Sequence, residues 1–133
     1  MFALATRFHA ILDYFFGFLL MIAPSLFGFG KGEWETIIPI LSGMIICFYS
    51  FFSKYKGGFY PVFPMRIHYA FDLAIGILVT TSPWIFGFRD LVYKPHVLIG
   101  FAVFLIGVFG VRPLEKLQKL RLHRPLANLM RFD

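Results

Sequence analysis

Four long apolar runs separated by short polar connections form the pattern of this chain. They cover residues 8–27, 36–52, 67–88 and 96–111. A helix needs about 20 apolar residues to cross about 30 Å of hydrocarbon, so runs of this kind predict membrane-spanning helices. A signal peptide does not fit the first run, because its apolar core would hold only about 7–15 residues. The pattern therefore predicts an all-α polytopic membrane protein with four transmembrane helices.

One segment of the chain occurs twice. Residues 7–29 and 66–88 align without a gap at an offset of 59, and nine of 23 positions are identical. The identical pairs are Arg7/Arg66, His9/His68, Asp13/Asp72, Gly17/Gly76, Leu19/Leu78, Pro24/Pro83, Phe27/Phe86, Gly28/Gly87 and Phe29/Phe88. Polar residues that recur in register inside apolar runs indicate an internal duplication. We therefore predict two repeats of two helices, at residues 1–59 and 60–111, followed by a tail at residues 112–133.

The composition agrees with a protein that has the bilayer as its solvent. Charged residues make up 15% of the chain, whereas a soluble domain carries about 25%. The net charge of +6 indicates anchoring at a cytoplasmic membrane face rather than binding to nucleic acid, because the basic residues lie at the ends of the apolar runs.

Lysine and arginine are divided unequally between the two sides of the predicted bundle. The connections on one side hold three of them, Lys31, Arg89 and Lys94. The other side holds ten, namely Arg7, Lys54, Lys56, Arg66, Arg112, Lys116, Lys119, Arg121, Arg124 and Arg131. Because basic residues accumulate on the cytoplasmic side, both termini are expected in the cytoplasm. The two repeats then have the same orientation and are related by a pseudo-two-fold axis along the membrane normal.

The tail at residues 112–133 is predicted to be a basic amphipathic segment. Leucines at positions 114, 117 and 120 form an apolar stripe among basic residues. This pattern is typical of a helix that lies on anionic lipid headgroups. A solvated basic tail is the alternative interpretation.

The triplet Ser82-Pro83-Trp84 lies near the end of the third apolar run. With the paired runs around it, the triplet resembles the motif of the SPW-repeat family of small bacterial integral membrane proteins, which are built from repeats of two transmembrane helices. The resemblance covers all four runs, although residues 23–25 of the first copy read Ala-Pro-Ser. It implies a multi-pass protein of the bacterial inner (cytoplasmic) membrane, and it supplies no activity.

The outer ends of the two repeated segments share a proline. Pro24 and Pro83 are predicted to break or kink the first and third helices there, because proline removes a backbone donor. Gly17 and Gly76 are expected to add local freedom. Tryptophans 34 and 84 are interpreted as part of an aromatic belt at the outer interface.

Each copy also carries a histidine and an aspartate four residues apart, on one face of its helix. The candidate polar cluster comprises Arg7, His9, Asp13, Arg66, His68 and Asp72. A charged side chain exposed to lipid costs about 2.5–3.5 kcal/mol or more, so these groups are expected to face the protein interior. One site holds all six if the first and third helices are neighbours.

Three interpretations of this cluster remain open. In the first, the groups pair across the axis and fasten the helices together, since polar groups hold membrane helices at about 0.6–2 kcal/mol each. In the second, they form a pathway for protons, ions or a small anion, because intramembrane histidine and aspartate are typical of proton relays. In the third, His9, Asp13, His68 and Asp72 bind a metal, or the two histidines ligate a haem, although the arginines would repel a cation. We take fastening as the main expectation and predict no cofactor.

The sequence contains no nucleophile triad, phosphate loop or dinucleotide fingerprint, so enzyme activity is not predicted. His96 and His123 are interpreted as incidental. The expected partners are the lipid bilayer, anionic headgroups at the tail, and a homo-oligomer or larger membrane complex, because 133 residues are few for a transporter that acts alone. No nucleic-acid partner is expected.

Overall fold

The computed structural model describes residues 2–54 and 58–110 of the chain. The helices are α1 (Phe2–Leu26), α2 (Trp34–Phe51), α3 (Met65–Ile85) and a fourth helix, Lys94–Gly110. Within the two described ranges there is no β-strand, and the prediction of an all-α fold with four helices is confirmed. The predicted amphipathic tail at residues 112–133 lies outside the described residues.

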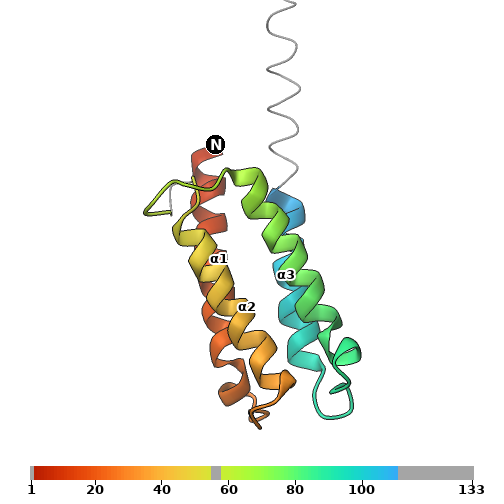
Figure 1. The fold of residues 1–133 in the computed structure, drawn as a ribbon. Coiled ribbons are helices and arrows are strands. Elements are labelled where there is room, and N and C mark those ends of the chain that lie inside the picture. Colours follow the sequence, from red (N-terminus) through yellow and green to blue (C-terminus); the bar gives the residue numbers. More distant parts are fainter. Residues whose placement is uncertain (1, 55–57, 111–133) are drawn as a thin grey trace, which may run out of the picture.

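The four helices form two antiparallel hairpins that stand side by side (Figure 1). α1 and α3 run in one direction, whereas α2 and the fourth helix run in the other. The starts of α1 and α3 therefore lie at the same end of the bundle as the end of α2. This arrangement brings the polar starts of the two repeated segments together, in the parallel relation that the duplication predicts.

Large apolar side chains cover the outer surface of the bundle. On α1 they recur every three or four residues, at Phe8, Ile11, Phe15, Phe18, Ile22 and Leu26. Each of the other helices also exposes large apolar residues. The segments Arg7–Leu26 and Trp34–Phe51 are long and apolar enough to cross a membrane, whereas Lys94–Gly110 is apolar but shorter. An exterior of this kind suits lipid better than water.

One small apolar core lies between the helices. Each helix contributes a side chain that is at most 4% exposed: Leu20 from α1, Ile46 from α2, Val79 from α3 and Val103 from the fourth helix. These four residues belong to one cluster of buried apolar side chains. We refer to them as the apolar layer, because polar groups are buried nearer both ends of the bundle.

Glycines let the helices of each hairpin approach closely. A Cβ atom on Gly17 of α1 would lie 3.2 Å from the backbone oxygen of Gly43 in α2. A Cβ atom on Gly76 of α3 would lie 2.5 Å from the backbone nitrogen and 2.6 Å from the Cα of Phe104. There is no room for a side chain at either contact, so both glycines serve close helix packing rather than local freedom.

A Phe-Gly-Phe sequence follows the end of α1 at residues 27–29 and the end of α3 at residues 86–88. α1 ends two residues after Pro24, and α3 ends two residues after Pro83. Gly28 and Gly87 follow with φ angles of 68° and 72°, a left-handed conformation that glycine adopts easily and that commonly ends helices. Each helix thus continues through its proline, and the predicted break falls just beyond it.

The connection between the hairpins folds back on the end of α2. The backbone N–H groups of Val62 and Phe63 both donate to the carbonyl of Phe52 at 2.8 Å, and the N–H of Lys54 donates to the carbonyl of Phe63 at 2.9 Å. These hydrogen bonds hold the fully buried Ser53 at the end of the bundle where α1 and α3 begin.

Replacing Gly76 by alanine tests the close packing of the second hairpin. We expect Gly76→Ala to destabilise the protein by about 1–3 kcal/mol, because the new methyl group would overlap the backbone of Phe104. Thermal melting in detergent measures the effect. Gly30→Ala is the matched control, since its Cβ would meet its nearest neighbour at an ordinary 3.4 Å. Equal melting temperatures for the two variants would contradict the packing argument.

Candidate functional site

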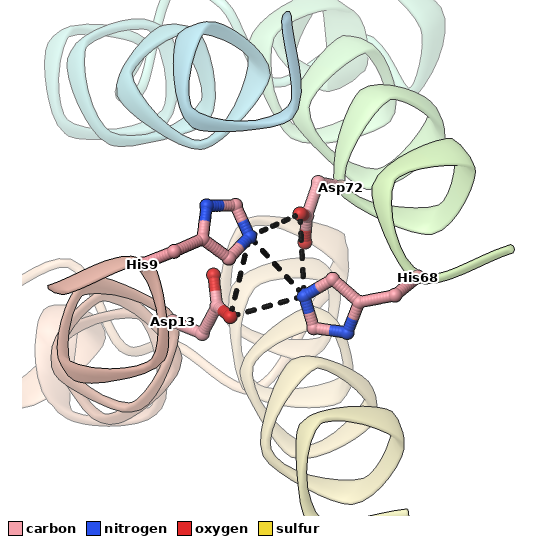
Figure 2. A group of neighbouring side chains, drawn as sticks. All are labelled: His9, Asp13, His68 and Asp72. Atoms are coloured by element: carbon pink, nitrogen blue, oxygen red, sulfur yellow. Dashed lines mark hydrogen bonds and ion pairs between the residues drawn. The ribbon is translucent and has the colours of Figure 1, made fainter. Parts of the chain in front are cut away.

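Four buried side chains from the two repeats meet at one end of the bundle. His9 and Asp13 come from α1, and His68 and Asp72 come from α3 (Figure 2). Each residue offers one ligand atom, and these four atoms all lie within 4.8 Å of one another. His9 is 8% exposed, Asp13 is 3%, Asp72 is 1% and His68 is 0%. We call these four residues the His/Asp cluster.

The contacts within the His/Asp cluster follow the pseudo-two-fold relation between the repeats. Between repeats, His68 Nε2 lies 3.0 Å from Asp13 Oδ2, and His9 Nε2 lies 3.3 Å from Asp72 Oδ2. Within each repeat, the corresponding distances are 3.5 Å for His9 and Asp13 and 3.6 Å for His68 and Asp72. The two Nε2 atoms are 3.3 Å apart. Each side chain therefore contacts its own repeat and the opposite repeat about equally.

Ser53 fixes how His68 is protonated. The hydroxyl of Ser53 has one hydrogen, and it donates that hydrogen to the carbonyl oxygen of Tyr49 at 2.6 Å. Ser53 Oγ also lies 2.8 Å from His68 Nδ1, so in this contact the serine oxygen must accept and Nδ1–H must donate. In the neutral imidazole, the lone pair is then on Nε2, which faces the His/Asp cluster.

Asp72 has one oxygen that is satisfied and one that is not. The hydroxyl of Tyr49 donates a short hydrogen bond to Asp72 Oδ1. Asp72 Oδ2, which is buried and aimed at the two imidazoles, has no hydrogen-bond partner among the residues that the structure describes. A buried carboxylate oxygen that makes no hydrogen bond is costly, and it requires either a proton or a cation close by.

The backbone explains why these side chains meet. A spacing of four residues places each histidine above its aspartate on the inner face of the helix. The fourth helix can approach Asp72 because Gly107 has no side chain, and a Cβ there would lie 2.9 Å from the Cβ of Asp72. Tyr49 and Ser53 are also four residues apart, at the end of α2 beside the His/Asp cluster. α1 and α3 therefore supply the cluster. Tyr49 of α2 and Ser53, two residues beyond the end of α2, supply its hydrogen-bond partners.

Two of the six predicted cluster residues have a different environment. Arg7 and Arg66 are exposed, so their guanidinium groups are not buried with the His/Asp cluster. Sequence reasoning also missed Tyr49 and Ser53, because only residues present in both copies drew notice. The signal that could have revealed them is a pair of polar residues at helical spacing at the end of an apolar run.

A second group of buried polar residues lies at the opposite end of the bundle. His96 is 2% exposed, and its Nε2–H donates to the carbonyl oxygen of Glu35 at 3.0 Å. Its ring lies between Phe29 and Phe88, with ring centroids 5.2 Å and 4.9 Å away. These two phenylalanines are equivalent positions of the two repeats. His96 was expected to be incidental, but it is buried between equivalent residues of the two copies.

A hollow of about 700 Å³ opens at this same end, between the two connections that follow α1 and α3. Its lining is mainly apolar, with the charges of Arg89, Asp90 and Lys94 at its rim. All three charged residues are exposed. No buried polar group among its described lining residues points into it, so it has none of the features that mark the His/Asp cluster.

In the triplet Ser82-Pro83-Trp84, the serine supplies a hydrogen bond that the proline cannot make near the end of α3. Pro83 has no N–H, so it cannot donate to the carbonyl of Val79, four residues before it. The hydroxyl of Ser82, which is fully buried, donates to that same carbonyl oxygen at 2.8 Å. The serine therefore replaces the hydrogen bond that the proline removes. In the first repeat the residue before the proline is alanine, which has no hydroxyl to offer.

The comparisons with known proteins identify the repeat. A family model described as the SPW repeat domain matches residues 7–110, which confirms the resemblance carried by the triplet and the paired helices. No curated protein and no solved structure matches the chain.

Replacing Ser82 tests the role of the triplet. We expect Ser82→Ala to lower the free energy of unfolding by about 1–3 kcal/mol, because the buried carbonyl of Val79 would lose its donor. Thr81→Val is the matched control, since the hydroxyl of Thr81 donates at 2.8 Å to the carbonyl of Ile77, four residues earlier, where no proline removes the helical donor. Chemical or thermal unfolding in detergent compares the two. A larger loss for Thr81→Val than for Ser82→Ala would contradict the explanation.

Proposed function

Because this chain belongs to the SPW repeat family, we propose that it is a four-span protein of the bacterial cytoplasmic membrane whose His/Asp cluster fastens its two repeats together. Membership of the family and the two long apolar helices indicate a membrane protein. The fastening role is supported by one observation above all. The contacts His68–Asp13 at 3.0 Å and His9–Asp72 at 3.3 Å each join one repeat to the other.

Three features support four spans with both termini in the cytoplasm. By sequence, ten of the 13 lysines and arginines belong to the side that holds the His/Asp cluster, six of them in the tail at residues 112–133, and such an excess is typical of a cytoplasmic face. Trp34 and Trp84, each 52% exposed, belong to the other end, where tryptophan suits the interface with water. Exposed apolar residues occur on all four helices, as expected if each helix contacts lipid.

Fastening is favoured on energetic grounds as well. Polar side chains buried away from water are stable only with partners, and removing one member of a buried ion pair costs about 3–5 kcal/mol. Every member of the His/Asp cluster has a partner in the opposite repeat. Separating the hairpins would therefore leave ionisable groups unpaired in a medium of low dielectric constant.

Conduction of protons or ions is the second candidate function, and buried polar residues at both ends of the bundle motivate it. The apolar layer of Leu20, Ile46, Val79 and Val103 lies between the His/Asp cluster and the Glu35–His96 group. A proton or ion crossing one chain would have to pass these four apolar side chains, each at most 4% exposed. Buried apolar side chains at this level favour fastening over conduction.

The proposed topology is tested by labelling single cysteines in intact cells. In a background with Cys47→Ser, we expect Lys31→Cys to react with a membrane-impermeant maleimide added outside the cytoplasmic membrane. Lys54→Cys should react only after that membrane is disrupted, because its connection is proposed to face the cytoplasm. Labelling of both positions from the outside, or of neither, would overturn the proposed topology.

The fastening role is tested with the double variant Asp13→Asn/Asp72→Asn. We expect its melting temperature in detergent to fall by several degrees, because the imidazoles lose their carboxylate partners across the repeats. The exposed Asp90→Asn is the matched control. A proton-flux measurement in liposomes accompanies the melt and should give equal rates for the double variant and the unaltered protein. An unchanged melt would refute fastening, and flux that disappears in the double variant would favour conduction instead.

A further inference from the structure

We propose that the His/Asp cluster binds one divalent transition-metal ion of the zinc class, through His9 Nε2, Asp13, His68 Nε2 and Asp72. The inference rests on the proposed fastening function and deepens it, because the ion would be the group through which the two repeats are joined. Four independent features of the site support it: the spacing of the four atoms, their lone pairs, the balance of charge and the surrounding hydrogen bonds.

Five of the six spacings between the four ligand atoms suit a tetrahedral ion. Zinc binds histidine nitrogen and carboxylate oxygen at about 2.0–2.2 Å, so neighbouring ligand atoms of a tetrahedral site are about 3.3–3.5 Å apart. The five contacts that involve a histidine measure 3.0, 3.3, 3.3, 3.5 and 3.6 Å. The sixth pair joins the two carboxylates and lies within 4.8 Å. Since carboxylates repel each other, this is the pair that a cation would draw together.

The lone pairs at the centre of the cluster need a common partner. Ser53 holds the proton of His68 on Nδ1, which leaves the lone pair of the neutral ring on Nε2. That atom faces Asp13 Oδ2, Asp72 Oδ2 and His9 Nε2. With His68 neutral, its Nε2 and the carboxylate oxygens beside it are all acceptors, and a proton on His9 Nε2 could be donated to only one of them. An ion at their centre would satisfy them all at once, including the Asp72 oxygen that makes no hydrogen bond.

The charge of such an ion balances the site. Two buried carboxylates carry two negative charges, and a divalent cation with two neutral imidazoles makes the group neutral. Neutrality matters because an uncompensated charge in a medium of low dielectric constant is costly. The two arginines had been expected to repel a cation. Both are exposed, so their charges are screened by solvent or headgroups rather than buried beside the ligands.

The hydrogen bonds around the cluster are those that metal sites use to orient their ligands. A metal-bound imidazole usually donates its other N–H to an oxygen, and a metal-bound carboxylate is usually hydrogen-bonded as well. Ser53 accepts from His68 Nδ1–H, and Tyr49 donates to the second oxygen of Asp72. These partners hold His68 and Asp72 in place with the ligand atoms directed inward.

The donor set selects the class of ion. Two imidazole nitrogens with two carboxylate oxygens suit zinc and its first-row neighbours, whereas magnesium and calcium prefer six or more oxygen ligands. A haem fits less well. Its two axial histidines stand on opposite faces of a wide flat ring, but here the Nε2 atoms are 3.3 Å apart with both carboxylates beside them. His9 is the most exposed of the four ligands, and it marks the side from which an ion would enter.

The test uses the full-length protein purified in detergent, stripped with a chelator and titrated with Zn²⁺ or Co²⁺. We expect about one ion per chain, a rise in melting temperature of several degrees, and a visible Co²⁺ spectrum of the four-coordinate type. Mg²⁺ and Ca²⁺ should give none of these effects. Asp13→Asn/Asp72→Asn should lose binding. His96→Gln, at the opposite end of the bundle, is the matched control and should keep it.

A second variant covers the case in which the double variant fails to fold. Tyr49→Phe keeps all four ligands and removes only the hydroxyl that donates to Asp72, so we expect it to bind Zn²⁺ about 10–100-fold more weakly. Equal affinity for Tyr49→Phe and the unaltered protein, or binding retained in the double variant, would overturn the metal site.

The outcomes also separate this inference from the fastening role. If the unaltered protein takes up no Zn²⁺ or Co²⁺ while the double variant still melts earlier, fastening stands and the metal site fails. If chelation lowers the melting temperature of the unaltered protein to that of the double variant, the ion itself joins the repeats. If neither chelation nor the double variant changes the melt, both proposals fail.

Discussion

The burial of two histidines and two aspartates between the repeats is the constraint on which the rest of the structure depends. Ionisable groups in a medium of low dielectric constant must be compensated within reach of their own atoms. The two repeats achieve this by presenting the same i, i+4 pair from two parallel helices, so that each histidine contacts both aspartates. This requirement fixes the register of α1 against α3. A shift of either helix by one turn, about 5.4 Å, would separate its histidine and aspartate from those of the other repeat.

The other contacts between the helices are compatible with this register of α1 against α3. Glycines at positions 17, 43 and 76 bring the helices of each hairpin into backbone contact. The Phe-Gly-Phe sequences end α1 and α3 at equivalent points and enclose His96 between them. Ser82 compensates for the donor that Pro83 removes, which lets α3 keep its buried face intact to its last turn. The two ends of the bundle are thus fixed by different contacts, with the His/Asp cluster at one end and His96, enclosed by Phe29 and Phe88, at the other.

Sequence alone predicted the helices well, because long apolar runs are strong signals and their ends carry glycine and proline. It also found the four cluster residues, since their recurrence at a constant offset distinguishes them from chance. It could not find Tyr49 and Ser53, which occur in one repeat only and act through contacts with residues far along the chain. It included Arg7 and Arg66 because they recur, but recurrence does not reveal that a long side chain at a helix end stays exposed. His96 was interpreted as incidental, because a histidine that occurs in one copy only gives no sign in the sequence that it is buried between the two copies.

The reciprocal contacts of the His/Asp cluster have a consequence for its history. Asp13 meets His68 while His9 meets Asp72, the self-complementary pattern of a two-fold dimer interface. A chain of one repeat would carry half of the cluster and would complete it only by pairing with a second copy inserted in the same direction. Fusion of two such copies makes the pair permanent and frees each half to diverge. That divergence is visible around the cluster: Tyr49 hydrogen-bonds Asp72, but isoleucine occupies the corresponding position, 106, because Gly43 packs on Gly17 as Gly100 packs on Gly76, an offset of 57. The present protein is therefore a dimer in one chain, with one half now specialised to support the other.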